Sequence, residues 1–189
     1  MALALPPRPR GILFDRDGTL VVDVPFNADP ERVALMPTAA DAVQRARAAG
    51  LRIGVATNQP GIATGDLSRE GLDRVNGRVE ALVGPFDAWF VCTHAKDAGC
   101  QCRKPEPGLI TRAARAWGLD PSELALIGDT KADLGAAERA GAHGVLVPNA
   151  RTRREEIDEA PRVASTLLDA VDLLLAPAPH SPALAGVRP

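Results

Sequence analysis

Short apolar runs alternate with longer stretches of helical spacing along most of this chain. The runs predicted to form strands lie at residues 11–14, 51–57, 86–92, 124–127 and 144–147, with a sixth strand expected to begin at Val163. Helices are expected at residues 38–49, 72–82, 107–117, 132–140 and 165–175. Such alternation is typical of a parallel sheet with helices on both faces. The sequence therefore predicts a Rossmann-like α/β fold.

A single domain accounts for this pattern. The 189 residues are 46% hydrophobic and 24% charged, which is average for a chain long enough to bury one substantial core. We expect an N-terminal extension at residues 1–10, the domain at residues 11–175 and a flexible tail at residues 176–189, where proline is frequent. Ser165 is expected to cap the last helix, and residues 151–156 to begin a solvated one, with a phosphate-binding patch there as the less favoured alternative.

Charge and hydropathy argue against two broad classes of function. The 22 basic and 24 acidic residues leave a formal charge of −2, which offers no field to attract a nucleic acid. No apolar run approaches the roughly 20 residues that a membrane span needs, and residues 1–10 are too short and too rich in proline for a secretory signal. We therefore expect a soluble, cytoplasmic protein that binds neither nucleic acid nor membrane, and we expect it to be a monomer.

Acidic residues follow the first predicted strand directly. Asp15 stands at its carboxyl end, where open α/β sheets build their sites, and Asp17 lies two residues further on. Two carboxylates this close repel each other unless a divalent cation lies between them or one of them keeps its proton. Gly18 lets the chain turn sharply beside them. Taken alone, the motif is better explained as an ordinary Asp-Gly turn after a strand.

The fourth predicted strand repeats this arrangement. Asp129 follows it, and Asp133 comes four residues later. If the first and fourth strands are neighbours, Asp129 faces Asp15 across one crevice, and the oxygen ligands suit Mg²⁺. Asp133 could steady this site from behind, or could simply be a favourable charge in the first turn of a helix.

Groups suited to an anion lie at the end of the second predicted strand and just before the third predicted helix. Thr57, Asn58 and Gln59 bring a hydroxyl, side-chain amides and backbone N–H groups that can donate to phosphate oxygens. Lys104 offers a point cation for a phosphate, and the neighbouring Arg103 a bidentate fork. We therefore expect these residues to bind a phosphorylated substrate.

All three cysteines of the chain fall within eleven residues, in a loop at residues 92–102. Cys92, His94, Cys100 and Cys102 form a Cys₃His set, which is typical of a closed, structural zinc site. A disulfide, or three unrelated thiols beside a surface histidine, are the alternatives. Because Arg103 and Lys104 follow the last cysteine directly, the metal would act on function indirectly, by fixing these two cations.

Four motifs, read in this order, closely resemble those of the haloacid-dehalogenase (HAD) superfamily of phosphatases. They are Asp15-Arg16-Asp17-Gly18-Thr19, Thr57, Lys104, and Gly128-Asp129 with Asp133. The resemblance covers residues 11 to about 150. It implies a nucleophilic Asp15, Asp17 as general acid and base, and Thr57 and Lys104 as phosphate clamps. It also implies Mg²⁺ bound by Asp15, Asp129 and the carbonyl group of Asp17.

The zinc ligands narrow the resemblance to one branch of this superfamily, which contains heptose bisphosphate phosphatases and histidinol-phosphate phosphatase domains. Its members lack a large cap domain. In that branch Asp23, Phe26 and Arg103 match positions that touch the substrate, whereas Thr130 stands where a lysine is common. The resemblance implies a Mg²⁺-dependent phosphatase of a small phosphorylated sugar, with zinc as a structural ion. Hydrolysis of histidinol phosphate and non-catalytic binding of a phosphosugar are the alternatives.

Overall fold

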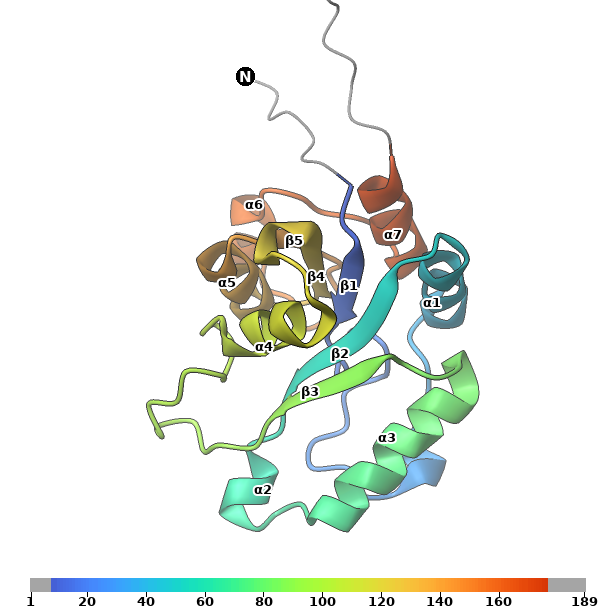
Figure 1. The fold of residues 1–189 in the computed structure, drawn as a ribbon. Helices are drawn as coiled ribbons and strands as arrows, with labels where there is room; N and C mark the ends of the chain where they lie inside the picture. Colours follow the sequence, from blue (N-terminus) through green and yellow to red (C-terminus); the bar gives the residue numbers. More distant parts are fainter. Residues whose placement is uncertain (1–7, 177–189) are drawn as a thin grey trace, which may run out of the picture.

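A five-stranded parallel sheet forms the centre of the molecule (Figure 1). The computed structural model describes residues 8–176. The strands are β1 (Gly11–Phe14), β2 (Arg52–Asn58), β3 (Ala88–Cys92), β4 (Leu124–Gly128) and β5 (His143–Leu146). Their order in the sheet is β3-β2-β1-β4-β5, and every pair is parallel. The predicted α/β fold with five parallel strands is confirmed.

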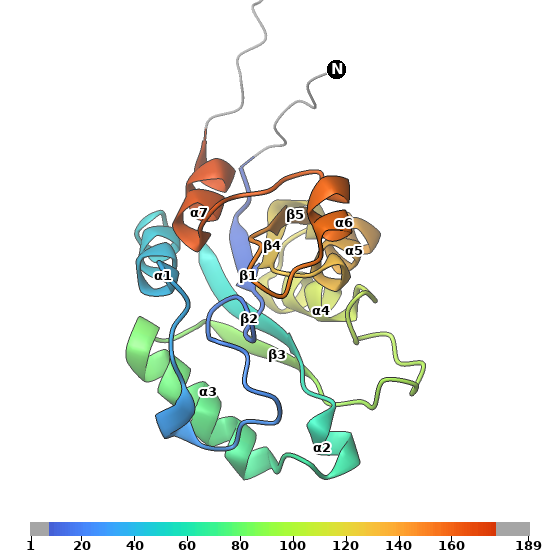
Figure 2. The ribbon, with the colours of Figure 1, turned by 180° about the vertical axis from the view of Figure 1, so that it is seen from behind.

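Helices cover both faces of this sheet (Figures 1 and 2). One face carries α1 (Ala39–Ala48), α3 (Arg69–Val83) and α7 (Leu167–Leu175), and the other carries α4 (Gly108–Trp117) and α5 (Lys131–Ala140). Side chains alternate along β1, so Ile12 and Phe14 pack in the first layer and Leu13 in the second. All four residues of β1 and all five of β4 are buried, as is typical of central parallel strands.

Short elements fill the connections between these strands and helices. They are α2 (Gly61–Thr64), α6 (Arg154–Glu159) and the 3₁₀ helices η1 (Pro30–Arg32) and η2 (Pro121–Glu123). Of these, the start of α6 lies where a helix was expected, at residues 151–156. None of the helices in the described part of the chain is both long and apolar enough to cross a bilayer.

Two expectations for the C-terminal third of the chain are wrong. Val163 begins no sixth strand, because it forms only an isolated bridge to Leu146 before the chain enters α7. The cap of α7 is Thr166, whose side chain accepts a hydrogen bond from the N–H of Asp169, and not Ser165. Residues 151–156 begin a helix and are mostly exposed, as expected, except that Glu156 is buried and accepts a hydrogen bond from the N–H of Lys131. Residues 1–7 and 177–189, within the expected extension and tail, lie outside the described residues.

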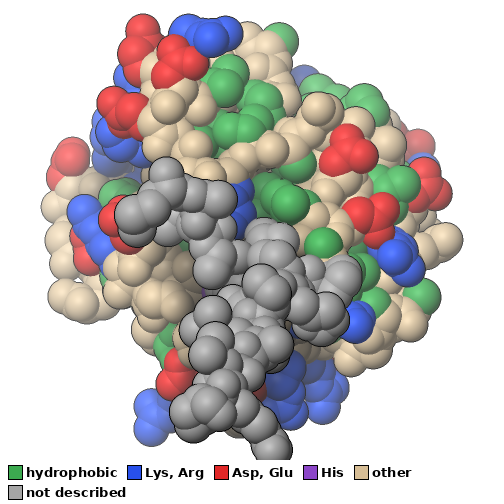
Figure 3. Space-filling model, turned by 90° about the horizontal axis from the view of Figure 1, so that it is seen from above, with side chains coloured by type: hydrophobic (Ala, Val, Ile, Leu, Met, Phe, Trp, Pro, Cys, Tyr) green, Lys and Arg blue, Asp and Glu red, His purple; other side chains and the backbone are tan. Residues whose placement is uncertain are grey.

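The order of the strands creates a switch point between β1 and β4. From β1 the chain continues outward to β2 and β3, whereas β4 and β5 extend the sheet on the opposite side. Ligand sites in open α/β sheets lie at such a point, outside the carboxyl ends of the strands. Asp15 follows β1 and Asp129 follows β4, so both acids lie at this point. Figure 3 shows the molecule from above the view of Figure 1, away from the carboxyl end of β1, and acidic and basic side chains both occur on that face.

Candidate active site

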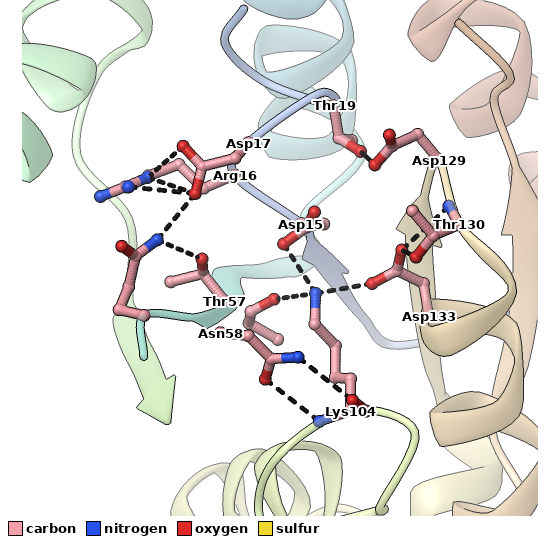
Figure 4. A network of polar contacts seen from close by, with 12 residues as sticks. Asp15, Arg16, Asp17, Thr19, Thr57, Asn58, Lys104, Asp129, Thr130 and Asp133 are labelled. Atoms are coloured by element: carbon pink, nitrogen blue, oxygen red, sulfur yellow. Dashed lines mark hydrogen bonds and ion pairs between the residues drawn. The ribbon is translucent and has the colours of Figure 1, made fainter. Parts of the chain in front are cut away.

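Lys104 lies at the centre of the polar network in Figure 4. Its Nζ is 2.6 Å from Asp15 Oδ1 and 2.6 Å from Asp133 Oδ1, and it donates to the carbonyl oxygen of Ala56 at 2.8 Å. Although burial acts to lower it, the pKa of Lys104 is raised by the charges of Asp133 and Asp15. The lysine is therefore a permanent positive charge beside Asp15.

Three buried carboxylates converge at the switch point. Asp15, Asp129 and Asp133 each offer an oxygen within 4.8 Å of the others. Burial raises the pKa of Asp15 to about 8, although the charge of Lys104 acts to lower it. Burial also raises the pKa of Asp129 to about 6, and the charge of Asp133 acts in the same direction. The expected meeting of Asp15 and Asp129 across one crevice is confirmed.

Asp129 has hydrogen-bond donors but no basic partner within residues 8–176. Thr19 Oγ1 donates to its Oδ1 at 3.0 Å, and Asn149 Nδ2 donates to its Oδ2 at 2.8 Å. Thr152 Oγ1 donates to its carbonyl oxygen at 2.8 Å. Sequence reasoning missed Asn149 and Thr152. Asn149 follows the end of β5 closely, and the rule that singled out Asp15 and Asp129 would have found it.

Two glycines allow this close packing of acids. Gly18 has a φ of +84°, and a Cβ at this position would lie 2.5 Å from Asp129 Oδ2. A Cβ on Gly128 would lie 2.3 Å from Asp133 Cγ. Asp133 lies in the first turn of α5, where its Oδ2 accepts hydrogen bonds from the N–H and the hydroxyl of Thr130. One oxygen of Asp133 therefore caps the helix, and the other contacts Lys104.

The carboxylate of Asp17 is turned away from the three converging acids. Arg16 pairs with it through Nε and Nη2, and Gln59 Nε2 donates to its Oδ2 at 2.7 Å. Arg16 itself is buried, and its Nη1 donates to Asn76 Oδ1 in α3 at 2.8 Å. Sequence reasoning assigned no role to Arg16 or Asn76. Together these contacts fix the side chain of Asp17 at the pocket wall.

The residues at the carboxyl end of β2 are used differently from the expectation. The side-chain amide of Asn58 donates to the carbonyl oxygen of Lys104 and accepts from its N–H, both at 3.1 Å. Gln59 Nε2 donates to Thr57 Oγ1 at 2.9 Å as well as to Asp17. These amides therefore hold Lys104 and Asp17 in place, while all three residues line the same pocket.

The pocket has a volume of about 480 Å³, which suits a small-molecule ligand. Its inner end is formed by Asp15 and Lys104, whose side chains are 11% and 3% exposed. Phe26, half exposed, lines another part of the wall. Arg103 also lines it, and its Nη1 is buried without a hydrogen-bond partner among the described residues. A buried donor of this kind is suited to an anionic ligand.

Asp23 and Arg151 line the more exposed part of the pocket, where they form an ion pair. The sequence analysis named Asp23 as a substrate contact but placed Arg151 on a solvated segment. Nothing in the neighbouring sequence distinguishes Arg151, which lines the pocket, from Arg153 or Arg154, which do not.

The four predicted zinc ligands are brought together in the loop after β3. Cys100 Sγ is 3.7 Å from Cys92 Sγ and 3.8 Å from Cys102 Sγ, and His94 Nδ1 is 3.6 Å from Cys92 Sγ and 3.2 Å from Cys102 Sγ. With Zn–S bonds of about 2.3 Å, a tetrahedral site requires sulfur atoms about 3.8 Å apart. The donor set and its spacing therefore fit a tetrahedral zinc ion.

Comparison with known proteins agrees with this geometry. A family model described as HAD-hydrolase-like matches residues 101–172, which include Lys104, Asp129 and Asp133. With the parallel sheet and the acids at its switch point, this match defines a HAD-like hydrolase.

Relatives and solved structures narrow this class. The chain is 34% identical to a D-glycero-β-D-manno-heptose-1,7-bisphosphate 7-phosphatase of Pseudomonas putida, over 76% of this chain and 85% of the relative. It is 37% identical to the protein of the same name from Mesorhizobium japonicum, over 75% of this chain and 71% of the relative. The chain therefore belongs to this family of HAD-like phosphatases.

A crystal structure gives the same result. The D,D-heptose 1,7-bisphosphate phosphatase from B. bronchiseptica, complexed with magnesium and phosphate, superimposes with a TM-score of 0.77 at 30% identity. The match covers 87% of this chain and 98% of that one.

Proposed function

We propose that this protein is a Mg²⁺-dependent phosphatase that removes the 7-phosphate of D-glycero-D-manno-heptose 1,7-bisphosphate. One observation carries the chemistry: the buried carboxylate of Asp15 lies in the pocket with Lys104 Nζ 2.6 Å away and two further acids around it. The choice of sugar is supported by the relatives, which bear the name of this reaction.

The converging acids fit Mg²⁺ by charge and by donor type. Asp15 and Asp129 offer carboxylate oxygens, the ligands that this ion prefers, and Asp129 has no basic partner in the described part of the chain. We propose that these two side chains and the carbonyl group of Asp17 bind the ion. Bound there, Mg²⁺ neutralises charge on the phosphate and on Asp15. Asp133 is already engaged by Lys104 and Thr130, so it supports the site from behind.

Asp15 is the nucleophile in this proposal. One carboxylate oxygen forms a bond to phosphorus as the bond from phosphorus to the sugar oxygen breaks. Lys104 and Thr57 bind the oxygens of the transferred phosphate, so that its charge is balanced throughout. The leaving sugar oxygen takes a proton from Asp17, which then accepts a proton from the water that attacks phosphoryl-Asp15. The products are the heptose 1-phosphate, inorganic phosphate and free Asp15.

Zinc has a separate, structural role in this proposal. Cys92, His94, Cys100 and Cys102 form a complete tetrahedral set that leaves no open position for a substrate. The last ligand is followed by Arg103 and Lys104, so an ordered loop places both cations in the pocket.

A substrate panel tests the proposed function. With Mg²⁺ present, we expect kcat/KM for heptose 1,7-bisphosphate to exceed that for hexose bisphosphates, sugar monophosphates and histidinol phosphate by at least about tenfold, the effect of one charged contact. Release of inorganic phosphate from each compound is the measurement. Preference for histidinol phosphate would reassign the substrate. Turnover of none of them would favour a protein that only binds phosphosugars.

The contact between Asn149 and Asp129 predicts a change in metal affinity. Asn149→Ala removes the donor 2.8 Å from Asp129 Oδ2 and the contact to the carbonyl oxygen of Gly18 at 2.9 Å. A group that holds a metal ligand in its orientation increases the affinity of the site for the metal. The Mg²⁺ concentration at half-maximal activity is therefore expected to rise about 10- to 100-fold. The kcat at saturating Mg²⁺ should change less. A Mg²⁺ titration that matches the wild type would contradict this role.

A further inference from the structure

The pocket has basic side chains at two depths. Arg16 and Lys104 are buried and are paired with Asp17 and Asp15, so they belong to the chemistry at the inner end. Arg151 lies in the exposed part, where 65% of its side chain is accessible to solvent. Since a bisphosphate has a second dianion away from the reacting phosphorus, this exposed part must balance additional negative charge.

The segment that follows Asp129 offers no other cation there. Thr130 is uncharged, and its hydroxyl donates to Asp133. The ammonium group of Lys131 pairs with Glu159 at 2.5 Å, and Lys131 does not line the pocket. Arg103 and Arg151 therefore remain as the basic side chains that are free of the chemistry at the inner end.

We propose that Arg151 binds the phosphate of the substrate that is not transferred, and that it determines preference for a bisphosphate over a monophosphate. This inference rests on the proposed function, and it deepens that function by naming a specificity residue. Asp23 is the exchangeable partner of Arg151, and it is displaced when a phosphate binds. A guanidinium group can bind two oxygens of a phosphate, which makes that contact stronger than a single exposed carboxylate contact.

The backbone of Arg151 is fixed relative to the reacting groups. Its N–H donates to Asn149 Oδ1 at 2.7 Å, and Asn149 Nδ2 donates to Asp129 at 2.8 Å. Thr152, on its other side, donates to the carbonyl oxygen of Asp129. The same short loop thus orients Asp129 and positions Arg151. The groups that would bind the reacting phosphate and the second phosphate are therefore held at a fixed distance from each other.

Substitution of Arg151 tests the proposal by comparing the loss of kcat/KM for the bisphosphate with the loss for a monophosphate. For Arg151→Gln, we expect kcat/KM for heptose 1,7-bisphosphate to fall about 10- to 100-fold, mainly through KM, as for loss of one charge-assisted contact. The loss for the 7-monophosphate of the same heptose should be at least tenfold smaller. Arg151→Lys should recover part of the loss. Arg154→Gln is the matched control, because Arg154 is 79% exposed and does not line the pocket.

Two outcomes would overturn the assignment. Equal losses on both substrates would mean that Arg151 only supports the loop, and an unchanged bisphosphate KM would mean that it does not touch the substrate. Calorimetric binding of both compounds to Asp15→Asn, with and without Arg151→Gln, gives the same comparison when no turnover occurs. If the wild type hydrolyses neither compound, the proposed function fails, while these binding data still decide the role of Arg151.

Asp23→Asn tests the exchange of partners. Removing this carboxylate frees Arg151, so KM for the bisphosphate is expected to fall or to stay equal. A rise in KM for both substrates would instead place Asp23 on the sugar and overturn its assignment as the partner that the phosphate displaces.

Discussion

Asp15→Asn is expected to abolish phosphate release, with kcat reduced by at least about 10³-fold, as when the nucleophile of a covalent mechanism is lost. An amide oxygen is a far weaker nucleophile than a carboxylate. The change also removes one of the acids that we propose as Mg²⁺ ligands. Release of inorganic phosphate from heptose 1,7-bisphosphate at saturating Mg²⁺ is the measurement.

The fold should survive this substitution. Asparagine is nearly the same size as aspartate, and Lys104 keeps Asp133 and the carbonyl oxygen of Ala56 as partners. The variant also removes a buried carboxyl group whose charged form is disfavoured by burial and by the neighbouring acids, as its raised pKa indicates. We therefore expect its melting temperature, measured without Mg²⁺, to equal or exceed that of the wild type. A large fall in melting temperature would mean that lost activity reports on folding.

Asp41→Asn provides a matched control. It makes the same chemical change on the exposed side of the first turn of α1. Its activity should equal that of the wild type. If Asp15→Asn retained more than a tenth of wild-type turnover, a phosphoryl-Asp15 intermediate would be excluded.

The sequence predicted the inner part of the site because that part depends on strand ends. β1 and β4 are short, wholly apolar runs, and their position in a parallel sheet decides where the next residue lies. Asp15 and Asp129 could be placed for this reason, although 114 positions separate their numbers. The cysteine loop was recognised because its four soft ligands lie close together in the sequence.

The supporting contacts were not predictable in the same way. Asn149 contacts Gly18, 131 positions away, and Arg16 contacts Asn76, 60 positions away. Such contacts depend on how loops fold over the edge of the sheet, and no local periodicity encodes that. The boundary errors have a similar origin. Valine favours strands, but the chain enters α7 at Leu167, a few residues after Val163. Val163 therefore forms only a single bridge, to Leu146.

Loss of the zinc ligands should damage both stability and substrate binding. We expect the purified wild-type protein to contain about one equivalent of zinc, and Cys100→Ser to lose most of it. Structural zinc contributes roughly 10–16 kcal/mol in small zinc domains. Even a loss of about 2–3 kcal/mol would lower the melting temperature of a domain of this size by roughly 5–10 °C.

The loss should extend beyond the loop because Lys104 connects it to the core. Lys104 lies two residues after Cys102 and is buried between Asp15 and Asp133. If the loop loses its order, these ion pairs are broken, and a buried carboxylate without its partner is costly. We therefore expect KM for the bisphosphate to rise at least about tenfold, with a further fall in kcat, because the transferred phosphate loses Lys104 and the pocket loses Arg103.

Gln101→Ser distinguishes the effect of losing zinc from the effect of any substitution in the loop. It introduces the same residue between two ligands, at an exposed position that offers no metal-binding atom in the proposed set. Its zinc content, melting temperature and KM should match those of the wild type. Metal analysis of protein purified without added zinc is the decisive measurement. Less than half an equivalent in the wild type, with no loss of stability in Cys100→Ser, would mean that the thiols and His94 are neighbours without a metal.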